Sequence, residues 1–597
     1  MQATQFYNNR ILTLSENKKQ LLKRKSSFGI LRLGAIIGMI AAFYFLWSVG
    51  KIYAIASAIA LAILFIRLIH KDLANRAAIK HTQFLITINE NELKALEGNY
   101  TQFENGASFT PHDHFYANDM DIFGKASLYQ FLNRTTSQLG GEKLANWLLY
   151  PAEKDSILNR QTAVKELTTL PEWRQNIEAL GKESSIKINT LTNIKEWLQQ
   201  PNLFIQFTHW SWLRYLLPAI LLSVTTAYIF DFIAEGTWYI FLFVSAAIAF
   251  QINKLVTPLH NQLSSMVDDL KILSASIEAI EIQAFTSPLL IQLKEKLQKQ
   301  KVVASTKINT LKNILDRLDL RYNIVIAIPL NIFLHWNLQQ VLDLEKWKKE
   351  NDSNVELWFD TLAEFEALNS FATIHFNNPA WCFPSLFENH FHIKANELGH
   401  PLINQHKRIN NFIKIQSAGE IMLVTGSNMA GKSTYLRSIG INVILTMAGA
   451  PVCAKSFELS PVQLLSSMRI ADNLEESTST FYAELKKLKT VIEKINAGEK
   501  VFVLLDEILR GTNSLDRHTG SDALIRQLIK QKAAAILATH DVALANLEKE
   551  YPKNIHNFHF DAQTKGEELF FDYKLKDGVC TNMNASLLMK KIGLELS

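Results

Sequence analysis

The sequence is poor in cysteine and carries no strong excess of one charge, and each shortage excludes a class of protein. Three cysteines, Cys382, Cys453 and Cys580, lie far apart with no Cys-x-x-Cys pair. This spacing argues against a disulfide framework and a zinc site and fits a reducing compartment. The net charge of +5 is modest for 597 residues and does not indicate the dense basic face of a nucleic-acid-binding domain. Ser/Pro-rich linkers and low-complexity tracts are also absent from the sequence.

Hydrophobic residues are not scarce, and they are gathered into long runs. They make up 48% of the sequence, and the mean hydropathy of +0.02 is slightly high for a soluble enzyme. A chain of 597 residues is too long for one core, so roughly three or four domains are expected.

The first two apolar runs extend from about Leu33 to Val49 and from about Ile52 to Ile69, with only Gly50 and Lys51 between them. Each approaches the roughly 17 to 25 residues that a helix needs to cross a bilayer. A buried hairpin of a soluble core is the alternative, but runs without a polar stripe rarely face water on any side. A signal peptide is disfavoured because a second run follows at once without a cleavage-like segment.

A second pair of apolar runs extends from about Tyr215 to Ile233 and from about Trp238 to Ile252. Aromatic residues cluster where the interfacial belts of a bilayer are expected: Trp210, Trp212, Tyr215, Trp238 and Tyr239. We therefore predict two membrane hairpins. A third run, Ile324 to Leu334, is too short to span and contains Pro329 and Asn331, so we interpret it as a packed or interfacial segment.

Basic residues flank both hairpins and predict their orientation. They are Lys18, Lys19, Lys23, Arg24 and Lys25 before the first, Arg67, Lys71, Arg76 and Lys80 after it, and Arg214 and Lys254 around the second. Positively charged flanks favour the cytoplasmic side of a membrane. Both hairpins are therefore expected to cross the membrane and come back, so that nearly all of the polar sequence lies in the cytoplasm. The cluster before residue 26 could also contact DNA phosphates, but topology explains it without a further assumption.

The soluble sequence between the hairpins is expected to be helical. Leu263, Met266, Leu270, Leu273, Ile277 and Ile280 repeat at alternating spacings of three and four residues. This seam predicts a long helix packed on a partner helix, and no chemistry is assigned to it.

A phosphate-binding loop begins after the apolar run Ile421 to Thr425, which is typical of a buried parallel strand. It runs Gly426-Ser-Asn-Met-Ala-Gly431-Lys432-Ser433-Thr434 and leads into a helical stretch. The glycines let backbone N–H groups converge on phosphate oxygens, and the helix N-terminus adds a partial positive charge. Lys432 is placed to reach the β- and γ-phosphates, and the Ser433 hydroxyl to bind Mg²⁺.

Two further strand ends carry candidate catalytic residues. The run Val501 to Leu505 ends in Asp506 and Glu507, of which the first suits Mg²⁺ and the second suits polarising the attacking water. The run Ala534 to Leu537 leads to His540, a candidate γ-phosphate sensor that in isolation would more often be a core histidine. The order of loop, carboxylates and histidine matches an ABC-type ATPase.

Hydroxyl residues are crowded before a helical stretch between the loop and the carboxylates, from Ser477 to Thr480. Exposed N–H groups at such a helix start make an anion site, although ordinary capping uses the same residues. In ABC-type dimers a segment of this kind completes the nucleotide site of the partner subunit.

Several of these motifs resemble the MutS family. Thr425 to Arg437 is similar to the MutS phosphate loop, including its Asn-Met pair, and Leu505 to Asn513 to the carboxylate strand and its following turn. Ser479-Thr480-Phe481 with Glu484 resembles the signature helix, and Ala538 to His540 the histidine motif. Looser similarity extends upstream to about residue 120, through Leu128 to Thr135, Leu362 to Leu368 and Gly399 to Pro401.

The resemblance implies a set of functional residues. Ser433 and Asp506 would hold Mg²⁺, and Glu507 and His540 would serve hydrolysis with Lys432. Ser479 would contact the ATP of the opposite subunit. The nucleotide phosphates would contact Gly426, Asn428, Gly431, Lys432, Ser433 and Thr434. The cofactors would be ATP and Mg²⁺, and the partners a second copy of the chain and mismatched or branched DNA. Adenine contacts would fall between Arg408 and Phe412, where no single residue is fixed.

The sequence also departs from the family. No Phe-x-Glu wedge occurs anywhere, and apolar runs replace the mismatch-reading N-terminal domain. Ser477 and Thr478 occupy positions where the family has a glycine and a basic residue. Mismatch recognition is therefore an expectation from family analogy alone.

The expected fold is mixed: four transmembrane helices in two hairpins, an all-α MutS-like core and lever region, and a C-terminal α/β P-loop ABC-type ATPase domain. The boundaries are 1–110 with the first hairpin at about 33–69, 111–398 interrupted by the second hairpin at about 215–252, and 399–597 for the ATPase.

Three functions compete at this point. The first is a multi-pass protein of the cytoplasmic membrane whose cytoplasmic ATPase is a DNA-directed dimeric switch. The second is a transport or membrane-remodelling ATPase with a MutS-type engine and no DNA recognition. The third, a non-hydrolysing scaffold, is disfavoured by intact Lys432, Asp506 and Glu507.

Overall fold

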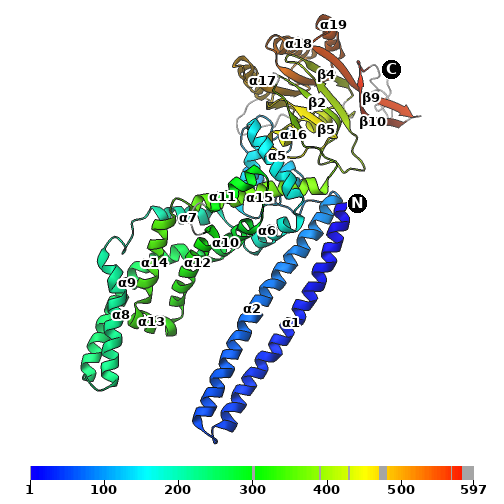
Figure 1. The fold of residues 1–597 in the computed structure, drawn as a ribbon. Coiled ribbons are helices and arrows are strands. Elements are labelled where there is room, and N and C mark those ends of the chain that lie inside the picture. Colours follow the sequence, from blue (N-terminus) through cyan, green and yellow to red (C-terminus); the bar gives the residue numbers. More distant parts are fainter. Residues whose placement is uncertain are drawn as a thin grey trace.

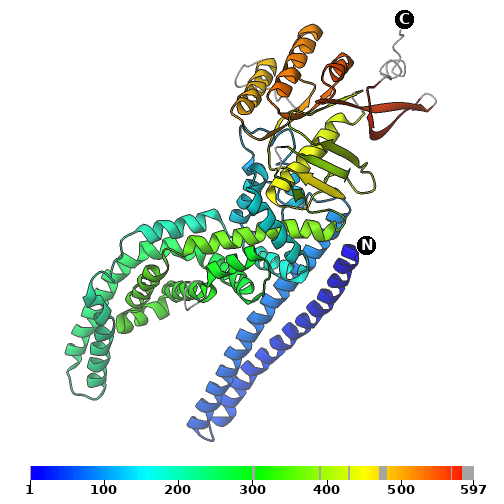
Figure 2. The same cartoon turned by 45° about the horizontal axis from the view of Figure 1, so that its top comes forward.

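The computed structural model describes residues 2–298, 303–388, 391–427, 430–468, 480–565 and 568–580. A largely helical region extends from Gln2 to Asn377, and an α/β domain follows it. Figure 1 shows the α/β domain at one end of the molecule, with two helical hairpins extending toward the opposite end. The turned view keeps both hairpin tips at that same end (Figure 2).

The first hairpin consists of α1 (Gln2–Leu46) and α2 (Lys51–Leu96), which pack along each other. At 1.5 Å per residue each helix is about 68 Å long, far longer than the predicted apolar runs. Those runs lie at the tip, and only 6% of the residues in the most apolar window of each helix are buried. Polar sequence therefore forms the half of the hairpin nearer to the α/β domain.

The second hairpin consists of α8 (Thr208–Ile229) and α9 (Glu235–Leu263). Near its turn Tyr228 stacks on Trp238 with ring centroids 5.0 Å apart, and the indole N–H of Trp238 donates to Thr225 Oγ1 at 3.2 Å. Four helical segments among the described residues have the length and apolar composition to cross a membrane: α1, α2, α8 and the segment Glu235–Ile282. The four predicted runs fall on these segments.

The remaining helices of the N-terminal region form an elongated bundle that extends from the α/β domain to the second hairpin (Figure 1). They are α3 (Leu128–Leu132), α4 (Gln138–Leu149), α5 (Lys154–Thr168), α6 (Pro171–Glu183), α7 (Ile188–Gln199), α10 (Val267–Ile282), α11 (Pro288–Leu297), α12 (Ala304–Asp319), α13 (Ile324–Leu334), α14 (Trp336–Asn351) and α15 (Val355–Asn377). The six residues of the predicted seam are all buried, and α10 packs against α12. They do not lie on one continuous α-helix, however, because Leu263 ends α9, Met266 lies in a 3-10 turn (Ser264–Met266) and the other four lie on α10.

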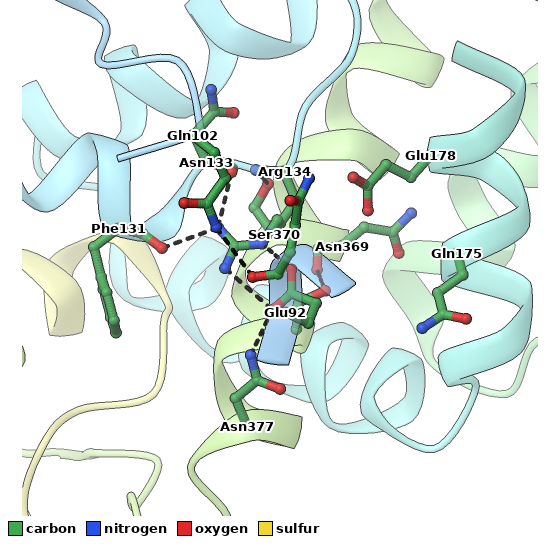
Figure 3. Close-up of polar contacts among 12 residues, drawn as sticks. Glu92, Gln102, Phe131, Asn133, Arg134, Gln175, Glu178, Asn369, Ser370 and Asn377 are labelled. Carbon is green, nitrogen blue, oxygen red and sulfur yellow. Dashed lines mark hydrogen bonds and ion pairs between the residues drawn. The ribbon is translucent and has the colours of Figure 1, made fainter. Parts of the chain in front are cut away.

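A buried polar cluster fixes the first hairpin to α15 (Figure 3). Glu92 of α2 forms an ion pair with Arg134, and both side chains are 2% exposed. Asn377 Nδ2 donates to Glu92 Oε2 at 2.7 Å, and the Tyr7 hydroxyl of α1 donates to Asn377 Oδ1 at 2.6 Å. The backbone N–H of Arg134 donates to Ser370 Oγ at 3.1 Å. Both hairpin helices are therefore tied to the helix that leads into the α/β domain.

The α/β domain is built on a six-stranded sheet in the order β10-β9-β4-β8-β7-β6. Its strands are β4 (Ile421–Gly426), β6 (Gln463–Ser467), β7 (Val501–Asp506), β8 (Ala534–Thr539), β9 (Ile555–Lys565) and β10 (Glu568–Asp577). The first five pair in parallel, and β10 pairs antiparallel with β9. The associated helices are α16 (Lys432–Ala448), α17 (Thr480–Asn496), α18 (Ser514–Lys530) and α19 (Leu547–Glu550). Parallel pairing brings the carboxyl ends of β4, β7 and β8 to one edge.

A second, four-stranded sheet has the order β1-β5-β2-β3, formed by β1 (Ser385–Leu386), β2 (Ile393–Leu398), β3 (Asn411–Ile415) and β5 (Ser456–Leu459). Its strands β1 and β2 precede Gly399 and pair with β5, so the sheet draws on residues from both sides of the predicted 398/399 boundary. The helical bundle contacts this domain directly, since Arg160 donates to the carbonyl of Ala448 at the end of α16.

Candidate nucleotide-binding site

The phosphate loop connects the buried strand β4 to α16, as the sequence predicts. Gly426 has φ 145°, and a Cβ atom there would lie 2.6 Å from the carbonyl oxygen of Phe560. Gly431, at the start of α16, has φ 102°. Both positions therefore require glycine, the first for close backbone approach as well as for conformation. Asn428, also predicted to contact nucleotide, lies outside the described residues.

Lys432 is almost completely buried inside the loop, with 3% of its side chain exposed. Its ammonium donates to the carbonyls of Gly426 and Ser427 at 2.7 and 3.0 Å. Burial lowers the pKa of Lys432 to about 8, against the opposing effect of Glu507 and Asp506. The ammonium thus lies within the loop, and burial disfavours its charged form.

Asp506 ends β7 beside the first turn of α16, where Ser433 and Thr434 are exposed. Burial raises the pKa of Asp506, and a hydrogen bond from Ser433 opposes this effect. Asp506 Oδ1 is buried and has no hydrogen-bond partner among the residues that the structure describes. One hydroxyl and one unsatisfied carboxylate oxygen fit Mg²⁺, which is usually held by one or two carboxylates, water and substrate phosphates.

Glu507 follows Asp506 in a left-handed conformation with φ 48°, which is strained for a residue with a side chain. Its carboxylate pairs with His540, lies 3.0 Å from Arg510 and 4.0 Å from Lys432. The contact with His540 holds the pKa of Glu507 below its usual value. The structure therefore brings three predicted site residues, Lys432, Glu507 and His540, to one point.

Arg510 was not predicted from the sequence as a site residue. It lies three residues after Glu507, and its guanidinium forms the 3.0 Å ion pair with that carboxylate. Its place within the motif Leu505 to Asn513 is the sequence signal that could have identified it.

The signature helix contacts the turn that follows Glu507. Ser479 lies outside the described residues, and α17 begins at Thr480. Glu484 of α17 accepts a hydrogen bond from the backbone N–H of Leu509 at 2.5 Å, and a Cβ on Gly511 would lie 2.6 Å from Phe481 Cβ. Burial raises the pKa of Glu484. The start of α17 and the turn after Glu507 are therefore in direct contact.

The segment expected near adenine lies beside the phosphate loop. The hydroxyl of Tyr435 on α16 donates to the carbonyl of Phe412 at 2.8 Å. Asn411 Nδ2 donates to the carbonyl of Tyr573, whose ring would lie 3.0 Å from a Cβ on Gly431. This surface joins β3, β10 and the start of α16, three elements distant in sequence.

Comparison with known proteins identifies the family of the C-terminal part. A family model described as MutS domain V matches residues 422–592. The DNA mismatch repair protein MutS of Persephonella marina is 30% identical over 234 residues, which are 38% of this chain and 26% of that protein. MutS protein homolog 4 of Homo sapiens is 32% identical over 199 residues, which are 32% of this chain and 21% of that protein.

A longer match reaches into the helical region. The DNA mismatch repair protein MutS of Chlorobaculum tepidum is 25% identical over 512 residues, which are 78% of this chain and 57% of that protein. The chain thus spans less than two thirds of the length of these relatives. Its C-terminal α/β domain matches MutS domain V, an ATPase domain, and the chain is distantly homologous to MutS and to MutS protein homolog 4 over part of its length.

Proposed function

We propose that this protein is a membrane-anchored, MutS-like ATPase that binds and hydrolyses ATP as a homodimeric switch and acts on DNA. The observation that carries the proposal is the combination of a MutS domain V with two exposed apolar hairpins at the opposite end of the molecule. The cluster of Lys432, Asp506, Glu507 and His540 supports ATP hydrolysis.

Each site residue has a proposed role. Gly426, Asn428, Gly431, Lys432, Ser433 and Thr434 bind the phosphates, Ser433 and Asp506 hold Mg²⁺, Glu507 positions the attacking water, and His540 senses the γ-phosphate. Bound Mg²⁺ supplies charge neutralisation at the β- and γ-phosphates. The strained backbone of Glu507 supports its role, because such strain often occurs at functional sites.

We further propose that Ser479 of one subunit completes the nucleotide site of the other, so that activity requires a dimer. Lys432→Ala and Ser479→Ala proteins should each be inactive alone, and mixing them should restore one complete site per mixed dimer. Mixing Lys432→Ala with Glu507→Gln is the matched control, since both changes affect the same half of a site and no complete site can form. Equal activity of the two mixtures would contradict a composite site.

The hairpins are proposed to anchor the protein in the cytoplasmic membrane as a multi-pass protein with the ATPase in the cytoplasm. The exposed apolar tips of α1 and α2, and of α8 and α9, support this because large exposed apolar surfaces are costly in water. The basic flanks on the polar side of both hairpins support the orientation.

DNA as the partner is proposed from the relatives, which are named for DNA mismatch repair. The absence of a Phe-x-Glu wedge favours branched DNA over single mispairs. Protein reconstituted in nanodiscs should bind a four-way junction more tightly than linear duplex, with affinity falling linearly on a log–log salt plot. Equal, weak binding of junction, mismatch and duplex would contradict the DNA-directed function.

A membrane-remodelling ATPase is the second candidate, and the exposed apolar hairpin α8–α9 at the far end of the helical region favours it. Stimulation of ATP hydrolysis by lipid but not by any DNA would support this candidate. Stimulation by junction DNA at constant lipid would support the first.

A further inference from the structure

The helix α13 (Ile324–Leu334) has an apolar surface that the described part of the chain does not cover. Ten of its 11 residues are apolar, Asn331 being the exception, and none of its side chains is buried. Ile324 is 71% exposed, Val325 81% and Ile328 55%. The sequence left open whether this run is packed or interfacial, and the exposure contradicts packing in a core.

Side-chain contacts give the position of α13 along the neighbouring helix α9. Arg321, just before α13, donates to Asn253 Oδ1 at 2.9 Å and also contacts Thr257. At the other end of α13, the carbonyl of Ile332 accepts a hydrogen bond from Ser245 Oγ at 2.5 Å. Asn253 and Ser245 lie eight residues apart on α9, which corresponds to about 12 Å. Helix α13 thus begins beside Asn253, where the apolar stretch of α9 ends, and extends toward Ser245 in the middle of that stretch.

The chain then turns back. The axes of α13 and α14 differ by 78°, with His335 between them in a left-handed conformation at φ 46°. Asn337 Nδ2 donates to Asn253 Oδ1 at 3.0 Å, and Asp343 of α14 pairs with Arg214 of α8 at 2.9 Å. Arg214 and Asn253 border the apolar stretches of α8 and α9. The chain therefore comes back to the same end of the second hairpin at which Arg321 precedes α13.

Backbone carbonyls at the end of α13 are paired within the protein, whereas His335 Nδ1 and Asn337 Oδ1 are buried without a hydrogen-bond partner among the described residues. Asn331 Nδ2 donates to the carbonyl of Ala327, and Asn331 Oδ1 accepts from the backbone N–H of Asn337. The backbone N–H of His335 caps the carbonyls of Leu330 and Asn331, and Ser245 caps Ile332. Non-helical backbone at membrane depth is tolerated only under this condition.

We propose that α13 is a re-entrant element that inserts into the cytoplasmic leaflet beside α8 and α9, with lipid acyl chains as the partner of its exposed face. At about 16 Å it is too short to cross a hydrocarbon core of about 30 Å. We choose lipid as the partner because the exposed face of α13 lies beside the exposed apolar part of α9, between Asn253 and Ser245, and extends the same apolar surface. This inference rests on the proposed membrane anchoring of α8 and α9.

Nitroxide accessibility in reconstituted bilayers tests this position. A spin label is attached at Val325→Cys in a Cys382→Ser background, because the other two cysteines are buried. Phe243→Cys on α9, 76% exposed, reports anchoring, and Thr306→Cys, exposed on α12, reports the aqueous phase. We expect the ratio of oxygen to water-soluble nickel-complex accessibility at Val325 to approach that at Phe243 and to exceed that at Thr306 clearly.

Each other result has a distinct meaning. Nickel accessibility at Val325 with lipid exposure at Phe243 overturns the α13 proposal and leaves the anchor intact. Shielding of Val325 from both reagents indicates a protein contact and also overturns it. Nickel accessibility at both positions refutes the anchor and the inference together. Ile328→Cys repeats the measurement in case the Val325 variant does not fold, and retained ATP hydrolysis checks folding of both.

Discussion

At the scale of single residues, the site concentrates opposite charges around the end of β7. The carboxylate of Glu507 contacts His540 and Arg510, and the ammonium of Lys432 lies 4.0 Å away. Glu507 is kept in its ionised form, because the His540 contact lowers its pKa. An ionised carboxylate that faces the phosphate loop is the form that can accept a proton from water.

Glu507→Gln should retain ATP binding and lose hydrolysis. The amide keeps the size of the side chain but cannot act as a base, so turnover should fall on the order of 10²- to 10⁴-fold. Single-turnover hydrolysis and equilibrium binding of labelled ATP measure the two effects separately. Lys432→Ala is the control that should lose binding itself, and turnover near the unmodified rate in Glu507→Gln would remove Glu507 from catalysis.

ATP affinity should weaken as the pH rises through about 8, the lowered pKa of Lys432. The lysine is charged below this pH and neutral above it, and only the charged form attracts phosphate. Between pH 7 and pH 9 the Kd should therefore rise about tenfold. Lys432→Ala should show weak binding with a flat profile over the same range, and a flat profile in the unmodified protein would contradict the assignment.

At the scale of elements, a buried charge pair joins α2 of the first hairpin to the segment after α3, and hydrogen bonds from both partners reach α15, the helix that enters the α/β domain. Glu92 on α2 accepts hydrogen bonds from Arg134 and Asn377 (Figure 3). Arg134 also lies over the ring of Phe103, with 3.6 Å from its guanidinium carbon to the ring centroid. Because neither charge of the pair reaches water, the joint depends on both partners.

Arg134→Leu should loosen this joint by about 3–5 kcal/mol, since it leaves the Glu92 carboxylate buried without a partner of opposite charge. Hydrogen–deuterium exchange in peptides covering residues 85–96 and 366–377 measures the local opening. The double variant Glu92→Leu/Arg134→Leu should recover much of the protection, because no charge is left uncompensated.

A surface pair provides the matched control for that measurement. Lys455 and Glu397 form an ion pair at 3.0 Å, with side chains 74% and 58% exposed. Lys455→Ala should change stability by no more than about 1 kcal/mol. Equal effects of Arg134→Leu and Lys455→Ala would contradict a structural role for the buried pair.

At the scale of the whole molecule, both apolar hairpin tips lie at the end opposite the α/β domain (Figure 2). A single bilayer can therefore contain both tips while the ATPase stays on one side. Movements of the ATPase would reach the first hairpin through α15 and the joint at Glu92.

Cysteine accessibility tests this topology. Cysteine placed at exposed Ala234, in the turn between α8 and α9, should react with an impermeant thiol reagent added outside intact cells. Cysteine at Thr306, exposed on α12, should react only after permeabilisation. The neighbouring Ser305 is unsuitable because it is 7% exposed and would resist labelling on either side. Labelling of Thr306→Cys in intact cells would overturn the four-span arrangement.

Local sequence patterns determined the position of the phosphate loop, the carboxylate strand and the four apolar segments. Each depends on a few adjacent residues, such as glycines at a strand–helix turn or a run without polar side chains, so no distant contact is needed to recognise it. The strand before Gly426, the helix after it and the strand ending at Asp506 follow the prediction for this reason.

Only the tertiary structure decided which distant groups meet. Arg134 and Glu92, 42 residues apart, pair in the interior, and Arg510 turns back onto Glu507 because the chain leaves β7 in a left-handed turn. Strands β1 and β2, before Gly399, join a sheet with β5 because their hydrogen bonds are satisfied by a segment 60 to 73 residues later. The apolar run Ile324–Leu334 suits a core and a bilayer equally well by composition, and only its lack of covering neighbours separates the two.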